Sequence, residues 1–217
     1  MIVDIEREKR LAAEAAAELV RDGMSVGLGT GSTVAYLLPV LADRALDLRC
    51  VSTSLRTEEA ARALGLRVEP FDGPDAIDHL DIAFDGADQI ASSGWLVKGG
   101  GAAHTREKRV AAAADRFVVI ASSDKLVERL APPVPLELLA FGLAATLRDL
   151  DPVRLRDVPP SPDGGVIADY LGAVDDPEAL AARLAATPGV VEHGLFPPTL
   201  VWQVLVGRDD GIERGWP

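Results

Sequence analysis

The sequence predicts an α/β fold, with a parallel sheet flanked by helices and then a second, smaller α+β domain. Short apolar segments alternate with helical patterns through the first 130 residues, which is typical of parallel strands joined by right-handed crossovers. Hydrophobic residues make up 48% of the chain and aromatic residues only 5%, which suits helices packed on a parallel sheet. Beyond residue 130 the pattern changes to proline-rich turns and mixed short segments.

The first 130 residues carry the signals of individual elements in order. Apolar residues recur at helical spacing over 4–22, and Gly23 is a stop signal. Ser32 is a cap residue for a second helix, and Gly65 ends a third. The predicted strands are 24–28, 48–52, 66–70, 81–84 and 116–121, and the predicted helices after the first are 32–46, 55–64 and 104–114.

The domain boundary is predicted near residue 130. Residues 1–130 form the larger domain, and residues 131–199 form a smaller α+β domain of a few strands and two helices, one of them over 177–187. The apolar stretch 200–206 is predicted to be a strand. It either belongs to the smaller domain or brings 200–217 back to the first sheet, and the pattern leaves both open.

Charge and composition exclude several classes of function. The net charge of −12 disfavours nucleic acid and anionic membranes as partners. No apolar run approaches the roughly 20 residues that a membrane helix needs. The first ten residues lack the apolar core of a signal peptide, so a cytoplasmic location is expected. The single cysteine, Cys50, is predicted to be a buried strand thiol, and the three scattered histidines predict no metal site.

Four polar loops follow predicted strands, at 29–33, 52–54, 85–88 and 122–125. The carboxyl ends of parallel strands lie at one edge of a sheet, where ligands bind. Small polar residues also make good turns, but four such loops together predict a ligand site at this edge.

The segment "GLGTGST" (27–33) predicts a phosphate site. Its backbone N–H groups and the hydroxyls of Thr30, Ser32 and Thr33 would meet an anion at a helix N-terminus, and Gly31 lets the backbone approach closely. The dinucleotide fingerprint fits poorly because Ser32 replaces its third glycine, and the NTPase loop fits poorly because no Gly-Lys-Ser/Thr follows. A tight turn without a ligand is the remaining alternative. Lys125, in the fourth loop, is predicted to supply a positive charge.

Four charged residues gather within a short stretch. Asp85 and Asp88 follow a strand, Lys98 precedes three glycines, and Glu107 falls in the first turns of a helix. Each has a structural explanation, as a turn former, a solvated lysine or a carboxylate at a helix N-terminus. Together, carboxylate bases and an ammonium group are what proton transfer next to a carbonyl requires.

These stretches resemble ribose-5-phosphate isomerase of the A type. The matching segments run from about residue 24 to 196 and read "GLGTGSTV", "STS", "DGAD", "KGGGAAHTREK", "VVIASSDK" and "PGVVEHGLF". The resemblance implies a Rossmann-like first domain, and a smaller domain that takes part in homodimer or homotetramer contacts. It also implies interconversion of D-ribose 5-phosphate and D-ribulose 5-phosphate through an enediolate, in the non-oxidative pentose phosphate pathway, without cofactor or metal.

The resemblance also implies residue roles. Glu107 would move the proton between C2 and C1, Asp85 and Lys98 would manage the sugar oxygens, and Asp88 would orient the substrate. The substrate-binding residues implied are Thr30, Gly31, Ser32, Thr33, Asp85, Gly86, Ala87, Asp88, Lys98, Gly99, Gly100, Gly101 and Lys125.

The chain departs from the family pattern outside the four central residues. Gln89 stands for a glutamate, His104 stands for a leucine, and Ser122 and Asp124 exchange places in a loop that usually reads Asp-x-Ser-Lys. Three alternative functions remain: a sugar-phosphate sensor, an isomerase or hydrolase for another phosphosugar, and an NAD-dependent dehydrogenase.

Overall fold

The computed structural model describes residues 3–215. The helices are α1 (Ile5–Ala17), α2 (Ser32–Asp43), α3 (Leu55–Ala63), α4 (His104–Ala112), α5 (Leu143–Leu150) and α6 (Pro177–Ala186), with short 3₁₀ helices η1 (Ser123–Lys125) and η2 (Pro198–Leu200). The strands are β1 (Ser25–Leu28), β2 (Arg49–Ser52), β3 (Ile82–Asp85), β4 (Gln89–Ala91), β5 (Leu96–Val97), β6 (Phe117–Ser122), β7 (Leu126–Val127), β8 (Val134–Leu138), β9 (Val153–Leu155), β10 (Val166–Tyr170), β11 (Val190–His193), β12 (Leu195–Phe196), β13 (Gln203–Arg208) and β14 (Gly211–Gly215).

The chain forms two compact units, and strand pairing rather than chain order decides their membership. The first unit holds the residues up to 87, 106–125 and those from 199 on, and the second holds 88–105 and 126–198. Segment 88–105, which the sequence analysis placed in the larger domain, therefore groups with the second unit. The cause is the hairpin β4–β5, which pairs with β7 and β12.

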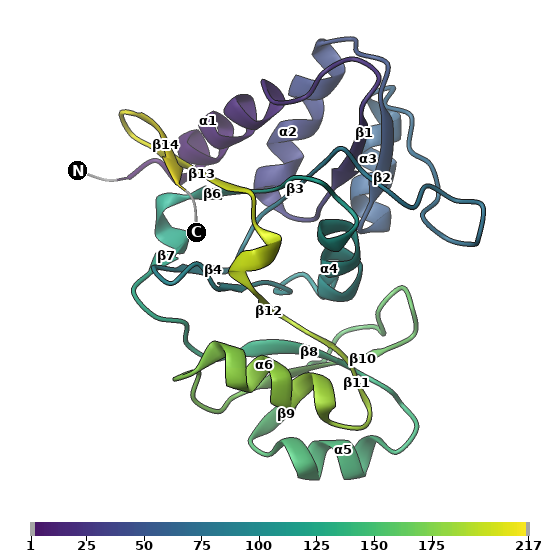
Figure 1. The fold of residues 1–217 in the computed structure, drawn as a ribbon, viewed down its shortest axis with the longest axis vertical. Coiled ribbons are helices and arrows are strands. Elements are labelled where there is room, and N and C mark those ends of the chain that lie inside the picture. Colours follow the sequence, from purple (N-terminus) through teal and green to yellow (C-terminus); the bar gives the residue numbers. More distant parts are fainter. Residues whose placement is uncertain (1–2, 216–217) are drawn as a thin grey trace. The chain divides into compact units, whose positions relative to one another are not determined.

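The first unit is built on a six-stranded sheet in the order β14-β13-β6-β3-β1-β2 (Figure 1). Its strands are parallel except for the edge pair β13–β14, which confirms the predicted parallel sheet. The strand expected at 200–206 is β13, and it returns to this sheet beside β6. From β1 the chain continues to β2 on one side and later to β3 on the other. Such a switch point is where open α/β sheets bind ligands.

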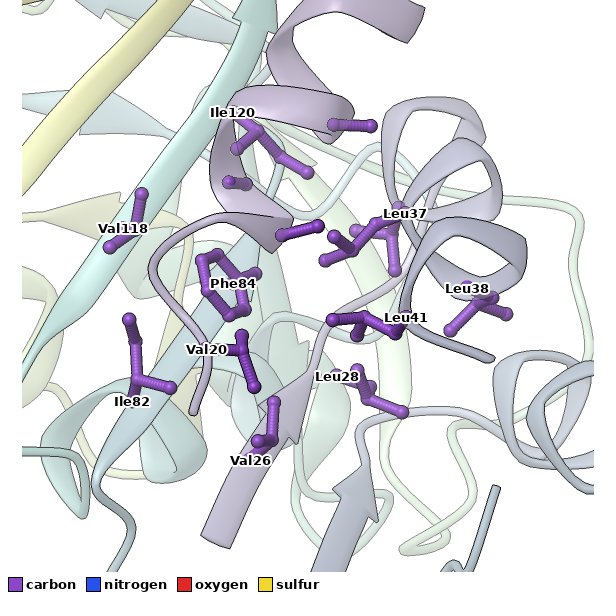
Figure 2. Close-up of a cluster of buried hydrophobic side chains, with 14 of the residues drawn as sticks. Val20, Val26, Leu28, Leu37, Leu38, Leu41, Ile82, Phe84, Val118 and Ile120 are labelled. Carbon is purple, nitrogen blue, oxygen red and sulfur yellow. The ribbon is translucent and has the colours of Figure 1, made fainter. Parts of the chain in front are cut away.

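Helices cover both faces of this sheet. Val26, Leu28 and Phe84 lie in the core with side chains of α1 and α2 (Figure 2). Gly27 alternates to the opposite face, where an added Cβ would lie 2.5 Å from a methyl of Val110 in α4. Helix α4, which carries Glu107, therefore packs on the face opposite α1 and α2.

The strand predicted at 66–70 is reduced to an isolated bridge between Val68 and Cys50. Two backbone hydrogen bonds join this stretch to Cys50, the second donated by the Glu69 N–H. Pro70 follows and has no N–H to extend the ladder, so the pairing stops there.

The first two predicted helices end several residues before their patterns do. Helix α1 ends at Ala17 rather than near residue 22. The N–H groups of Leu19 and Val20 donate to carbonyls three residues earlier, as in a turn, and the Arg44 guanidinium donates to the Ala17 carbonyl. Helix α2 ends at Asp43 and contains Pro39.

The second unit contains two small sheets. The four-stranded antiparallel sheet β11-β8-β10-β9 shares a core with α5 and α6, which confirms the predicted α+β character. The second sheet, β12-β5-β4-β7, is made of short strands, and β4, β5 and β7 were not among the predicted strands. Within residues 3–215 no helix is both long and apolar enough to cross a bilayer.

The thiol of Cys50 is expected to be inert in the folded protein. Cys50 is fully buried in β2, and burial raises the pKa of its thiol to about 12. Because the pKa is raised, only about one molecule in 10⁴ carries a thiolate near pH 8. Iodoacetamide at that pH should leave the native chain unmodified by mass spectrometry and alkylate it once in denaturant. Rapid alkylation of the native chain would show that β2 opens.

Candidate active site

Asp85 ends β3, and its carboxylate is held at the switch point of the first unit. The side chain is buried, and Oδ1 accepts hydrogen bonds from the N–H groups of Thr30 at 3.0 Å and Gly86 at 2.8 Å. A Cβ added at Gly29 would lie 2.1 Å from the Asp85 carboxyl carbon, so only glycine allows this approach. The loops after β1 and β3 are therefore in direct contact and joined by a hydrogen bond, as expected of neighbouring loops at one sheet edge.

The start of α2 presents backbone N–H groups beside that carboxylate. Its N-cap residue is Gly31, with φ of 124°, and within residues 3–215 no side chain caps the helix by a hydrogen bond. Gly31 and Ser32 are exposed, whereas Thr33 is buried. Thr30 packs inward, with Oγ1 2.8 Å from Oγ1 of the buried Thr53 in the "STS" loop. An uncapped, accessible helix N-terminus favours an anion.

Lys125 ends η1 and lies beside a carboxylate. Its Nζ is 3.2 Å from Oδ2 of Asp124, and the Ser122 hydroxyl donates to Oδ1 of the same side chain at 2.5 Å. Burial alone would raise the pKa of Asp124, but the Ser122 hydrogen bond and the Lys125 ammonium together hold that pKa below its ordinary value. Asp124 is thus an anion that offsets part of the charge of Lys125.

Glu107 lies in the first turn of α4 and is only 4% exposed. The helix macrodipole favours a carboxylate at this position. Removing a carboxylate from water nevertheless costs several kcal/mol in typical proteins. The fold therefore keeps the Glu107 carboxylate buried at the helix start although its desolvation is unfavourable.

Lys98 follows β5 in the second unit and is 2% exposed. Its N–H donates to the Gly194 carbonyl at 2.8 Å, and its Nζ lies 5.4 Å from the centre of the Phe196 ring. A Cβ at Gly194 would fall 2.1 Å from the Lys98 carbonyl oxygen. The "PGVVEHGLF" segment therefore packs directly against Lys98.

The three glycines after Lys98 form a tight loop. Gly99 has φ of 106°, and an added Cβ would lie 2.7 Å from Nδ1 of the fully buried His104. The imidazole that stands for the family's leucine therefore packs against the loop backbone. On the other side, the Gly100 N–H donates to Oδ2 of Asp88 at 2.7 Å.

The sequence-predicted residues thus fall into two groups. Within the first unit the structure joins Asp85 and Gly86 to the loop that carries the predicted phosphate site, Thr30 to Thr33. Ala87 is the last residue of that segment before the chain enters the second unit. Within the second unit it joins Asp88 to the loop Gly99–Gly101 that follows Lys98.

Sequence reasoning missed three supporting residues: Phe196, Arg156 and Glu137. The buried Glu137 carboxylate accepts hydrogen bonds from the hydroxyls of Thr105 and Ser161. No motif includes Arg156 or Glu137, and Phe196 ends the matching segment "PGVVEHGLF" without being assigned a role, because the partners of all three lie far away in the chain. Within residues 3–215 no group of three acidic, histidine or cysteine side chains is arranged to hold a metal ion.

The family model of ribose 5-phosphate isomerase A (phosphoriboisomerase A) matches residues 49–211. The chain belongs to the ribose 5-phosphate isomerase A family. A relative named ribose-5-phosphate isomerase A from Halobacterium salinarum is 46% identical over 221 residues, which cover 95% of this chain and 94% of the relative.

Solved structures of the family share the fold over nearly the whole chain. The ribose 5-phosphate isomerase A of Methanocaldococcus jannaschii has a TM-score of 0.89 at 33% identity and covers 96% of this chain and 98% of its own. A D-ribose-5-phosphate isomerase in complex with phospho-erythronic acid has a TM-score of 0.91 at 31% identity and covers 99% of this chain and 100% of its own. The Rossmann-like assignment of the first domain agrees with these folds.

Proposed function

We propose that this protein interconverts D-ribose 5-phosphate and D-ribulose 5-phosphate through an enediolate, as its family does. One observation carries the proposal: three ionisable side chains, Asp85, Lys98 and Glu107, are each no more than 4% exposed. Lysine, aspartate and glutamate are almost never this buried without a specific reason. A base, an acid and a cation shielded from water suit proton transfer next to a sugar carbonyl.

Glu107 acts as the base in this proposal. Its carboxylate takes the proton from C2 of the open-chain aldose, the C–H electron pair forms the C1–C2 double bond of the enediolate, and the π pair of the C1 carbonyl moves onto the C1 oxygen. The proton then returns to C1, and a second proton passes from the C2 oxygen to the C1 oxygen. The reaction moves protons within one molecule and consumes no oxidant or reductant.

Asp85 and Lys98 act on the oxygen atoms of the sugar in the same scheme. The Lys98 ammonium stabilises the negative oxygen of the enediolate, and Asp85 exchanges a proton with a sugar hydroxyl during ring opening. Asp88 and the loop Gly99–Gly101 contact the sugar chain. Phospho-erythronic acid, bound by a relative, carries a planar anionic carboxylate, which shares its shape and charge with an enediolate.

The phosphate end of the substrate is assigned to residues Thr30 to Thr33, where α2 begins. Lys125 follows β6, and β3 lies between β6 and β1 in the sheet. Two strand spacings amount to about 10 Å, a span that a lysine side chain and a phosphate group together can bridge. The Asp124 carboxylate reduces the contribution of Lys125 but does not remove it.

Replacing Lys125 with alanine is expected to raise KM for ribose 5-phosphate about threefold to thirtyfold while leaving kcat within about twofold, because a phosphate contact acts equally in ground and transition state. Steady-state kinetics at constant ionic strength measure both constants. Lys125→Arg keeps the charge and serves as the control. An unchanged KM in the alanine variant would remove Lys125 from the phosphate site.

The proposed function is tested by ribose 5-phosphate turnover, measured by the appearance of ribulose 5-phosphate with and without a chelator. Robust turnover that the chelator does not diminish is expected. Parallel assays with other phosphosugars and with a nicotinamide cofactor separate the alternatives. A folded protein that turns over another phosphosugar but not ribose 5-phosphate would overturn the assignment.

The same proposal includes a homodimer or homotetramer in the cytoplasm. The second unit exposes large apolar side chains: Phe141 is 94% exposed, Leu139 51% and Val191 43%. Side chains of this kind mark protein contact surfaces when they gather on one face. Light scattering coupled to size-exclusion chromatography gives the mass in solution, and a monomer at assay concentration would remove this part.

A further inference from the structure

The Arg156 guanidinium, in the second unit, connects a buried acid to the glycine loop. Its Nη1 donates to the carbonyl oxygens of Gly99 at 2.9 Å and Gly100 at 3.2 Å. Its Nε and Nη2 donate to Oδ1 of Asp169 at 3.0 and 2.6 Å. Asp169 is buried in β10, so it is a fixed anchor, and it fixes the plane of the guanidinium.

One peptide group of the loop is bonded at both ends. The Gly99 carbonyl accepts from Arg156, and the N–H of the same peptide group, on Gly100, donates to Asp88 at 2.7 Å. Any rotation of this peptide plane breaks both bonds. Asp88, assigned to the substrate from the sequence, and Arg156, which no motif indicated, therefore act on the same backbone unit from opposite sides.

The loop has a physical need for such a restraint. Three consecutive glycines have more backbone freedom than any other tripeptide, and Gly100 and Gly101 are exposed. One turn bond, from the Ala102 N–H to the Gly99 carbonyl at 3.0 Å, restrains the same carbonyl, but it lies within the loop and does not tie the loop to the rest of the second unit. Lys98 immediately precedes this loop, so disorder in the loop would reach the Lys98 ammonium.

Only arginine fits the position. A guanidinium is planar and has five donors in a fixed fork, so it can bond a carboxylate on one edge and two carbonyls on the other. A lysine ammonium is a point charge on a flexible stem and cannot bond the carboxylate and the two loop carbonyls in fixed directions at the same time. The neighbouring Arg154 reaches the other oxygen of Asp169 at 3.6 Å and is two-thirds exposed, but within residues 3–215 its side chain makes no hydrogen bond to the loop.

We propose that Arg156, oriented by Asp169, is a positioning residue that fixes the Gly99–Gly100 peptide group and with it the sugar-lining loop behind Lys98. Its catalytic consequence rests on the proposed function, whereas its effect on loop order does not. Arg156 and Asp169 also line an open hollow of 480 Å³ with Gly100 and Gly101, so a small cation from solvent can reach the place of the guanidinium.

The experiment compares Arg156→Ala with Arg154→Ala, which removes an arginine from the same acid without removing a loop contact. Arg156→Ala is expected to lower kcat at least about tenfold, from the loss of charged hydrogen bonds to the loop. Millimolar guanidinium chloride, but not sodium chloride, should restore part of it. Arg156→Lys should not recover wild-type kcat, and Arg154→Ala should stay within about twofold of wild type.

Hydrogen exchange gives a readout that needs no activity. Amides of 99–102 should exchange faster in Arg156→Ala and remain unchanged in Arg154→Ala. Unchanged exchange and kcat in Arg156→Ala, or equal losses in both variants, would overturn the inference while ribose 5-phosphate turnover by the unmodified chain still upholds the proposed function. Absence of that turnover would overturn the function, and faster exchange in Arg156→Ala alone would still support the loop restraint.

Discussion

Replacing Glu107 with glutamine is expected to lower kcat for ribose 5-phosphate by at least about a hundredfold, because a positioned general base typically contributes 10²–10⁴ in rate. Glutamine keeps the size and the hydrogen-bonding reach of the side chain but cannot accept the C2 proton. The fold should persist, since Glu107 is one side chain in the first turn of α4. Steady-state kinetics measure the loss, and incorporation of solvent deuterium into the recovered sugar phosphate should fall in parallel.

A matched control separates lost basicity from lost helix charge. Glu58 also lies in the first turn of a helix, α3, where it pairs with Arg62 at 2.8 Å. Glu58→Gln removes the same charge from an equivalent helix position without touching the proposed chemistry, so its kcat should remain within about twofold. A Glu107→Gln variant with wild-type kcat would remove Glu107 from the mechanism.

Replacing Gly29 with alanine is expected to lower kcat/KM by at least about a hundredfold, because a displacement of about 1 Å at a catalytic group can cost that much. The new methyl would stand 2.1 Å from the Asp85 carboxyl carbon, so the carboxylate must move. Its hydrogen bonds from the N–H groups of Thr30 and Gly86 would then break. Unfolding free energy should fall by about 1–3 kcal/mol from overpacking. Kinetics and thermal denaturation measure the two effects.

Gly23→Ala is the control for the cost of placing alanine at a glycine. Gly23 precedes β1 at the far end of the strand, has φ of 79°, and has nothing within 4 Å of an added Cβ. Its variant should lose about 1–2 kcal/mol of stability from the left-handed backbone and keep wild-type kcat/KM. If Gly29→Ala lost stability but kept its kcat/KM, the position of the Asp85 carboxylate would not matter for turnover.

The larger elements of the first domain could be predicted because their signals are local. Strand β1 and helix α3 appear within a residue or two of the predicted bounds, since apolar runs and glycine stops act within a few residues. The predicted strand 66–70 shrank to a bridge at Val68 because its pairing depends on a partner strand and on Pro70. The hairpin β4–β5 was missed because its two strands are short and their four apolar residues lie inside a segment rich in turn residues.

The charged residues of the candidate site were visible as types and spacings, but their surroundings were not. The sequence places Asp85 after a strand, yet only the pairing of β1 with β3 brings the Thr30 N–H to its carboxylate. Similarly, Lys98 reads as a cation before glycines, whereas the Phe196 ring beside it comes from a strand about a hundred residues later. No local pattern indicates the role proposed for Arg156, because that role depends on its contacts with both Asp169 and Gly99.

By itself the sequence determined the alternation of strands and helices, the family, and the acid, base and cation offered for chemistry. These follow from propensities and from residue types at short spacing, which do not depend on the rest of the chain. Only the tertiary structure decided to which unit segment 88–105 belongs, which carboxylates are buried, and which backbone groups donate hydrogen bonds to them. Those outcomes follow from strand pairing and side-chain packing between residues far apart in the chain, which no local pattern records.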